Sequence, residues 1–257
     1  MTTARGPQRV DGWTAAVRQR LGLGRLLPLG GPADGAWIAE TAAASVLRGA
    51  AARPGTVLGR LRIGPVEEAA EGAVAEDGRA AGPDRANAAD PAGPVPPPAP
   101  PSALPPGPLR IEAEFSAAPD RPLPDTAAAL RAALLTAAAA RLGLEVTEVD
   151  LTVTALLEDG APDQVTAQPP PAARVAKPEG PVATAAAGAP GVVSLTRVLG
   201  SPVHTARDHV RVEVATAGDH RALDVARSVR TAVAAAAEER LPVSVLVTDV
   251  AEPGPGG

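Results

Sequence analysis

Apolar and charged residues alternate along three stretches of this chain, a pattern that predicts β-strands with one buried and one solvated face. The clearest stretch is 109–115, which reads Leu-Arg-Ile-Glu-Ala-Glu-Phe. Residues 57–63 and 149–155 have the same period of two. Because the apolar side chains of each stretch can face one core, we expect the three strands to form a small sheet.

Two further stretches place apolar residues three or four positions apart, which is the spacing of one helix face. One is 123–142, and Gly143 behind it favours a helix end. The other is 35–50, where Asp34 is a suitable N-cap residue. With the three strands, they predict a unit in the order helix, strand, strand, helix, strand.

The second half of the chain repeats this unit. We expect its strands near 192–199, 208–216 and 243–250 and a helix near 220–240. Its first helix is limited to a turn or two, because prolines and glycines interrupt 172–188. Similar pieces follow one another in the same order: 53–64 with 189–200, 110–112 with 211–213, 125–134 with 224–233, and 141–142 with 240–241.

These elements predict an α/β (α+β) fold of two tandem units, each a small mixed sheet with helices on one face. The units either pack face to face or join at their sheet edges, since one unit alone buries little surface. The expected organisation is an N-terminal amphipathic helix with a Gly/Pro turn at 1–32, a first unit at 33–157 interrupted by an unfolded Pro-rich insert at 65–107, a linker at 158–180, a second unit at 181–250 and a tail at 251–257.

The Pro-rich segment admits two interpretations. Prolines at 94–101 favour extended polyproline geometry and remove backbone donors. We interpret 92–107 as a linker without further function. The alternative is an adaptor that docks through this segment in an aromatic-lined groove of a partner.

Composition narrows the function classes. Two tryptophans and one phenylalanine are the only aromatic residues, so the core must consist mainly of Val, Leu and Ala. The lack of cysteine excludes disulfides, thiolate nucleophiles and cysteine metal sites. The net charge of −5 argues against nucleic-acid binding. No apolar run suits a transmembrane helix or a signal-peptide core, so we expect a cytoplasmic protein.

No catalytic constellation is visible, and we expect neither an enzyme nor a need for a cofactor or metal. The neighbours Asp208 and His209 point to opposite faces if they lie on a strand, so their adjacency does not make an acid–base dyad. The spacing of His204, Asp208 and His209 is compatible with a metal site. A polar hairpin connection is the simpler interpretation.

The N-terminal helix is one candidate interaction surface. An amphipathic helix with arginines near its apolar stripe can lie on an anionic membrane or dock on a partner. The alternative is ordinary packing of its tryptophan stripe on the first unit. The candidate contact residues are Trp13, Val17, Arg18, Arg20, Leu21 and Arg25.

A cleft between the two units is a second candidate surface, because ligand sites favour such interfaces. We expect His220 and Asp224 near its mouth. A ligand there would make the protein a small-ligand binder or an enzyme, which is the alternative to a non-catalytic role.

Several stretches resemble the alkaline-shock, or general-stress, protein family of bacteria: 143–153 in the first unit, and 190–192, 211–214 and 225–233 in the second. Members of that family usually carry one unit and no long Pro-rich insertion, so this chain departs from them in both respects. The whole chain also resembles actinobacterial proteins named after the p-ten fibre protein of nucleopolyhedroviruses, through 21–32 and the pair Trp37-Ile38.

The resemblance implies a non-catalytic structural or interaction role related to stress or to the cell envelope. It brings no catalytic residues with it. The implied place is the cytoplasm, with a peripheral position at the inner membrane face, and the implied partner is a protein, a membrane protein being one choice. The oligomeric state stays open.

Overall fold

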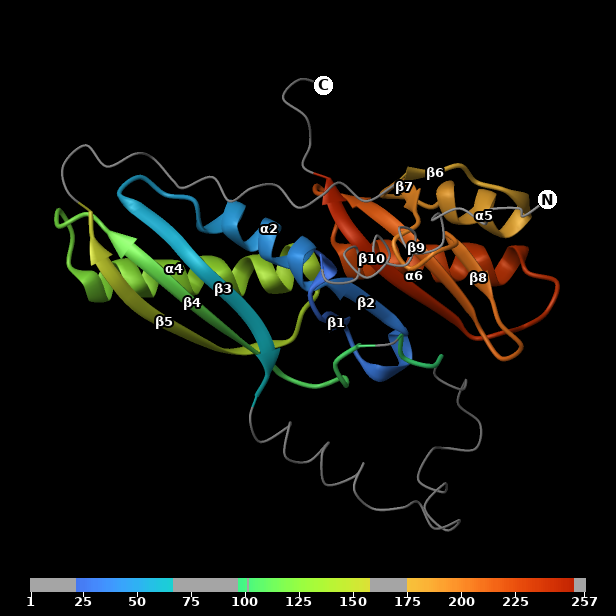
Figure 1. Ribbon diagram of the computed structural model, residues 1–257, viewed down its shortest axis with the longest axis horizontal. Coiled ribbons are helices and arrows are strands. Elements are labelled where there is room, and N and C mark those ends of the chain that lie inside the picture. Colours follow the sequence, from blue (N-terminus) through green and yellow to red (C-terminus); the bar gives the residue numbers. More distant parts are fainter. Residues whose placement is uncertain (1–21, 67–96, 101, 158–174, 252–257) are drawn as a thin grey trace, which may run out of the picture.

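Two mixed β-sheets and the helices packed on them make up the described part of the chain, residues 22–66, 97–100, 102–157 and 175–251. The computed structural model in Figure 1 has the α+β class that the sequence predicts. Buried apolar residues from both sheets belong to one connected core. None of the described helices is long and apolar enough to cross a membrane.

The first sheet consists of β3 (Thr56–Pro65), β4 (Leu109–Ala117) and β5 (Val146–Leu156). The central strand β4 is antiparallel to β3 and parallel to β5. Alternate residues of β4 are buried, among them Ile111 and Phe115, which are fully enclosed. The two-residue period of the sequence therefore predicts both the strand and its buried face.

Helices cover only one face of this sheet (Figure 1). α2 (Glu40–Ala51) packs on β3, and α4 (Leu123–Ala137) packs on β5. α4 continues into a π-helical turn, η2 (Ala138–Leu142), and Gly143 ends it with φ +88°. The helix predicted over 123–142 is confirmed, including its glycine stop.

The second sheet contains the same arrangement. β9 (Val210–Ala217) is antiparallel to β7 (Val192–Thr196) and parallel to β10 (Val243–Ala251). α5 (Gly180–Ala187) and α6 (Ala222–Ala236) pack against each other and against these strands. The repeat seen in the sequence is thus a repeat of topology, and the first helix of the second copy is as short as its prolines predict.

Four more strands enlarge the second sheet, which the sequence did not predict. β6 (Val175–Ala176) pairs with β7, and β8 (Val203–Thr205) pairs with the start of β9. At the other edge, β2 (Ala36–Ala39) runs parallel to β10, and β1 (Leu26–Leu29) is antiparallel to β2. The second sheet therefore has seven strands, while the first has three.

The helix predicted over 35–50 is wrong in its first turn. Residues 36–39 form strand β2, and the helix begins at Glu40. All four side chains of β2 are buried, and Trp37 and Ile38 lie opposite Leu246 and Val247 of β10. Burial of these side chains in the second sheet outweighs the local helical spacing of Ile38 with the residues that follow.

The predicted division of the chain near residue 33, and the start of its first unit, do not follow the two sheets. β1 and β2 lie within the ranges assigned to the N-terminal segment and the first unit, yet they belong to the second sheet. Asp34 does not cap a long helix, since it ends the 3-10 turn η1 (Pro32–Asp34). Its carboxylate accepts hydrogen bonds from the Gly31 amide at 2.9 Å and from Arg227 of α6 at 2.8 and 3.1 Å. Arg227 is the main cause of the lowered pKa of Asp34.

Part of the Pro-rich insert predicted at 65–107 is folded. Pro97 is buried against Gly35, where a Cβ atom would approach its ring to within 2.3 Å. The amide of Leu26 in β1 donates to the Ser102 carbonyl at 3.4 Å, and the Leu104 amide donates to the Leu26 carbonyl at 2.8 Å. This stretch therefore covers the edge of the second sheet. Within the docking segment proposed at 92–107, Pro97 and Pro100 are buried in the chain itself, whereas Pro98, Ala99, Pro105 and Pro106 are exposed.

Glu40 joins three elements at the junction of the two units. Its carboxylate accepts hydrogen bonds from the Arg25 guanidinium at 3.3 and 3.4 Å and from the Ile63 amide of β3 at 3.1 Å. Burial alone would raise the pKa of Glu40, but the bonds from Arg25 and Ile63 outweigh it and hold that pKa below its ordinary value. The carboxylate is thus charged where the first turn of α2 meets β3.

Candidate binding face

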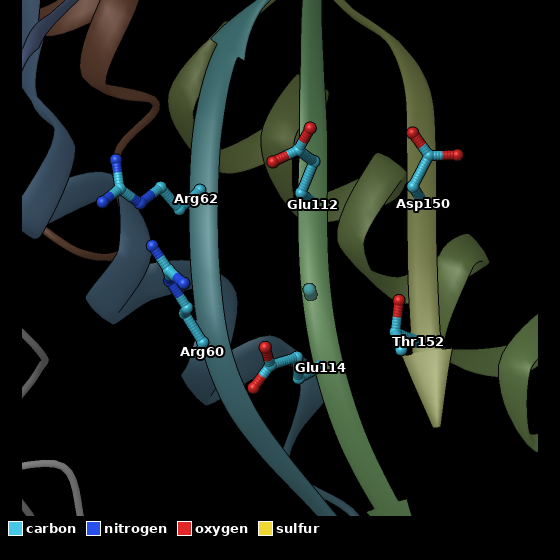
Figure 2. A pocket seen from close by; sticks show the side chains of 7 residues that line it. Arg60, Arg62, Glu112, Glu114, Asp150 and Thr152 are labelled. Atoms are coloured by element: carbon cyan, nitrogen blue, oxygen red, sulfur yellow. The ribbon is translucent and has the colours of Figure 1, made fainter. Parts of the chain in front are cut away.

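The face of the first sheet opposite its helices is open and carries charged side chains. Figure 2 shows Arg60 and Arg62 on β3, Glu112 and Glu114 on β4, and Asp150 and Thr152 on β5. These six residues, with Ala113, line a shallow hollow of about 350 Å³. We call them, together with Arg110 and Glu148, the charged sheet face.

Strand register sets the order of charges on this face. Arg62 lies opposite Glu112, which in turn lies opposite Asp150. A bulge after Leu58 in β3 shifts the pairing, so that Arg60 falls within the stretch of β3 that borders Glu114. The arginines of the hollow are therefore on one edge strand, and the acids lie on the other two.

Arg110, near the N-terminal end of β4, lies among three carboxylates of the charged sheet face. Its guanidinium is 3.6 Å from Glu112, 3.9 Å from Glu148 and 3.8 Å from Asp150. Like charges on neighbouring strands repel, so Arg110 reduces the repulsion between these acids. Exposed ion pairs of this length contribute little to stability, which leaves the acids available to another molecule.

The second sheet contains the counterpart of this arginine–glutamate pair. Arg211 and Glu213 occupy the positions that Arg110 and Glu112 occupy in the first copy, and their charged atoms are 3.7 Å apart. Glu213 is fully buried, whereas the side chain of Glu112 is 59% exposed. The Glu213 carboxylate accepts hydrogen bonds from the amide of Val198 at 2.6 Å and from the amide of Leu199 at 3.1 Å.

Burial dominates the electrostatics of Glu213. Loss of solvent raises the pKa of this carboxyl, against the opposing influence of the Leu199 and Val198 amides and of Arg211. The connection between β7 and β8 therefore lies on the carboxylate and shields it. In the first sheet, the equivalent glutamate meets water.

The charged sheet face has no catalytic arrangement that the described residues reveal. It is open to solvent, and it offers carboxylates and guanidinium groups without a histidine or a hydroxyl nucleophile paired with a base. The described residues hold no group of three or more His, Asp or Glu side chains suited to a metal ion. Charged side chains held on neighbouring strands can form ion pairs and hydrogen bonds with a charged or polar surface.

The structure locates one of the six N-terminal candidate residues. Trp13, Val17, Arg18, Arg20 and Leu21 lie outside the described residues. Arg25 is described, and its guanidinium bonds to Glu40 and to the Ile63 carbonyl, the latter at 2.6 Å. Arg25 is therefore engaged inside the chain.

The candidate cleft residues lie near each other at the start of α6 but have partners there. His220 Nδ1 is 2.8 Å from Asp219, and the His220 ring lowers the pKa of that aspartate. Asp224 lies 3.5 Å from Arg221 and 3.7 Å from Arg227. The hollow described above lies on the first sheet, away from both residues.

The two histidines of the β8–β9 hairpin, His204 and His209, have different neighbours. His209 pairs with Asp208 at 2.9 Å, while His204 is on β8 opposite Arg211. Asp208 and His209 precede β9 and do not lie on a strand, so the prediction that they point to opposite faces is wrong. The pair is at the surface, and no third ligand joins it among the described residues.

Sequence reasoning missed the charged sheet face as a site. The alternation over 109–115 predicts a wet face, but a wet face is the ordinary state of an antiparallel or mixed sheet. The signal that could have found it is the repeated Arg-x-Glu motif at 110–112 and 211–213. Only the structure shows that one copy is covered and the other is open.

Comparison with family models, with curated proteins and with solved structures finds no match for this chain. The resemblance to the alkaline-shock family therefore stays a prediction, and the site has to be interpreted from its own geometry.

Proposed function

We propose that this protein is a non-catalytic interaction protein that holds a segment of a partner protein on the charged sheet face. The observation that carries the proposal is the difference between Glu112 and Glu213. The same motif, on the same strand of the same topology, binds two backbone amides in the second sheet and none that the described residues supply in the first.

The geometry supports a peptide segment as the ligand. In the second sheet, the carboxylate receives the amides of two successive residues, Val198 and Leu199, from the connection between β7 and β8. A partner loop with two successive free amides could bind Glu112 in the same way. Arg60 and Arg62 would then meet acidic side chains of the partner, and Asp150 a basic one.

The shape of the face favours a protein over a small molecule. Small-ligand sites are usually enclosed and largely apolar, whereas this hollow is shallow and lined mainly by charged side chains. The strands also hold the backbone of these residues at fixed spacing. Binding then costs mainly conformational freedom of the side chains, above all that of the arginines.

The resemblance to the alkaline-shock family extends the proposal to the cell envelope. In that extension, the partner is a protein at the inner membrane face, and the protein itself is cytoplasmic and peripheral. This part rests on the resemblance alone. Recovery of the partner from the membrane fraction, as opposed to the soluble fraction, tests it separately.

Site-specific photo-crosslinking in native cells tests the binding face. A photoreactive residue replaces Thr152, which lines the hollow, and in a control it replaces Thr205, which is exposed on β8. We expect a discrete protein adduct from position 152 and none from 205. Adducts from neither position, in cells where the protein is abundant, would sink the proposal.

A charge exchange gives the matched control for this experiment. The double variant Arg62→Glu with Asp150→Arg alters the face without changing the net charge, and we expect it to abolish the adduct at 152. The exchange Glu238→Arg with Arg240→Glu, at exposed residues after α6, should leave the adduct intact. Equal loss in both variants would mean that overall charge, not the face, determines the contact.

A further inference from the structure

β5 is a long strand at the edge of the first sheet, and no described strand pairs with its outer side. It spans 11 residues, and among the described strands it pairs only with β4. It contains no proline and no lysine, and its two charged residues, Glu148 and Asp150, both lie in its first half. Two of its apolar side chains are exposed, Val153 at 41% and Leu156 at 57%.

The opposite edge of the same sheet is protected. β3 ends at Pro65. It contains a bulge after Leu58, but β5 also shifts register against β4, at Thr147 and at Thr154, so bulges do not distinguish the two edges. Both backbone groups of Ile63 are engaged, since its amide donates to Glu40 and its carbonyl accepts from Arg25. On β5, Arg131 of α4 donates to the Val149 carbonyl at 3.1 Å, in the first half of the strand. The second half of β5 is the open part.

The repeat shows that this edge can carry another strand. β10 occupies in the second sheet the place of β5 in the first, and its outer edge is covered by β2, with 36–38 beside 245–247. No described strand takes that place beside β5. The topology therefore leaves in the first unit an edge that the second unit fills.

The distribution of charge along β5 indicates which strand can pair with its outer side. The acids of β5, Glu148 and Asp150, lie in its first half, and 151–156 carries no charge. Two copies in antiparallel arrangement place the acidic half of each strand beside the uncharged half of the other. A two-fold axis at Thr152 brings Asp150 level with Thr154, where β5 shifts register against β4, whereas a parallel pairing would place like charges side by side.

We propose that two copies of the chain pair antiparallel through β5, so that their first sheets join into one continuous sheet. Exposed Val153 and Leu156 then become covered, and unpaired backbone groups of the edge gain partners. The inference is independent of the proposed function, because edge pairing leaves the charged sheet face open. The dimer would display that face twice.

Sedimentation velocity on the full chain from low to high micromolar concentration tests the proposal. We expect a concentration-dependent monomer–dimer equilibrium. Hydrogen exchange at the same concentrations should show added amide protection in 151–156 as the dimer forms. A chain that stays monomeric throughout, or that dimerises without added protection in β5, overturns the proposal.

A pair of opposite charges at one position separates pairing from damage to the fold. Thr154→Arg places a cation opposite Asp150 of the partner copy and should tighten the dimer about three- to tenfold. Thr154→Asp should weaken it by a similar factor. Loss of the Ser116–Thr154 contact at 3.1 Å is common to both variants, so weakening by both would overturn the proposed register.

Val193 supplies the control. It is 55% exposed on β7, a strand that has neighbours on both sides, β6 and β9. Val193→Arg and Val193→Asp change the charge at an exposed apolar position of the second sheet, away from β5. Both should leave the dimerisation constant unchanged, and a change comparable with that at Thr154 would contradict the assignment to β5.

Discussion

The two sheets share one topology and differ in how much of each is covered. In the second sheet, the connection between β7 and β8 lies on Glu213, and strands β1 and β2 extend the edge of β10. In the first sheet, Glu112 is solvated and the edge of β5 has no described neighbour. Duplicated units can thus diverge: one carries the additions that complete a sheet, and the other leaves a face and an edge exposed among the described residues.

The largest expected effect concerns the buried faces. Phe115 of β4 is fully enclosed, and the repeat places Thr216 of β9 at the equivalent position, also fully buried. Phe115→Ala should lower the free energy of unfolding by about 3–5 kcal/mol, because it leaves a large cavity. Urea unfolding of the full chain measures it.

The equivalent change in the second sheet should cost much less. The Thr216 hydroxyl has no hydrogen-bond partner among the described residues. Thr216→Ala removes a small group and an unsatisfied hydroxyl together, so we expect a loss below about 1.5 kcal/mol. Comparable losses at both positions would mean that the two cores are more alike than their side chains indicate.

The next effect compares the two glutamates directly. Glu213→Ala leaves two buried amides and a neighbouring arginine without their acceptor, so we expect a loss of about 2–4 kcal/mol in unfolding free energy. Glu112→Ala should change it by no more than about 0.5 kcal/mol, because the side chain is exposed. A large loss from Glu112→Ala would show that this face is structural and would weaken the case for a binding site.

The smallest effect is a difference in pH dependence. The pKa of Glu213 is raised above its ordinary value of 4.5, so its contribution to stability is fully present below that value and is lost as the pH rises through the folded-state pKa. The pKa of Glu40 is lowered, so its contribution is present above 4.5 and is lost as the pH falls through the folded-state pKa.

Glutamine variants isolate these two contributions. The stability of the wild type relative to Glu213→Gln should fall as the pH rises above 4.5. Relative to Glu40→Gln, it should fall as the pH drops below 4.5. Thermal unfolding at several pH values measures both, and equal slopes would remove the assigned difference between the two sites.

The sequence predicts those elements whose pattern is decided locally. The alternation of β4 and the apolar stripe of α4 follow from one buried face each, and both are where the sequence places them. Trp37 and Ile38 defeat local reasoning, because one of the two strands beside them is formed by 245–247, more than two hundred residues away. No period within 35–50 contains that information.

The candidate site shows the same limit. Arg110-Ile-Glu112 and Arg211-Val-Glu213 are nearly identical in sequence, so no local pattern distinguishes the exposed glutamate from the buried one. The difference comes from the connection at 197–202, which lies on one of them. Two of the candidate residues chosen from the sequence, Arg25 and Asp224, already form ion pairs within the chain.

The pairing of β2 with β10 has a consequence for biosynthesis. The strand at 36–39 is synthesised about two hundred residues before its partner at 243–251. Until β10 is synthesised, Trp37 and Ile38 have only β1 of their two neighbouring strands beside them. Pairing across such a separation is slow and leaves apolar surface exposed until the second strand is available.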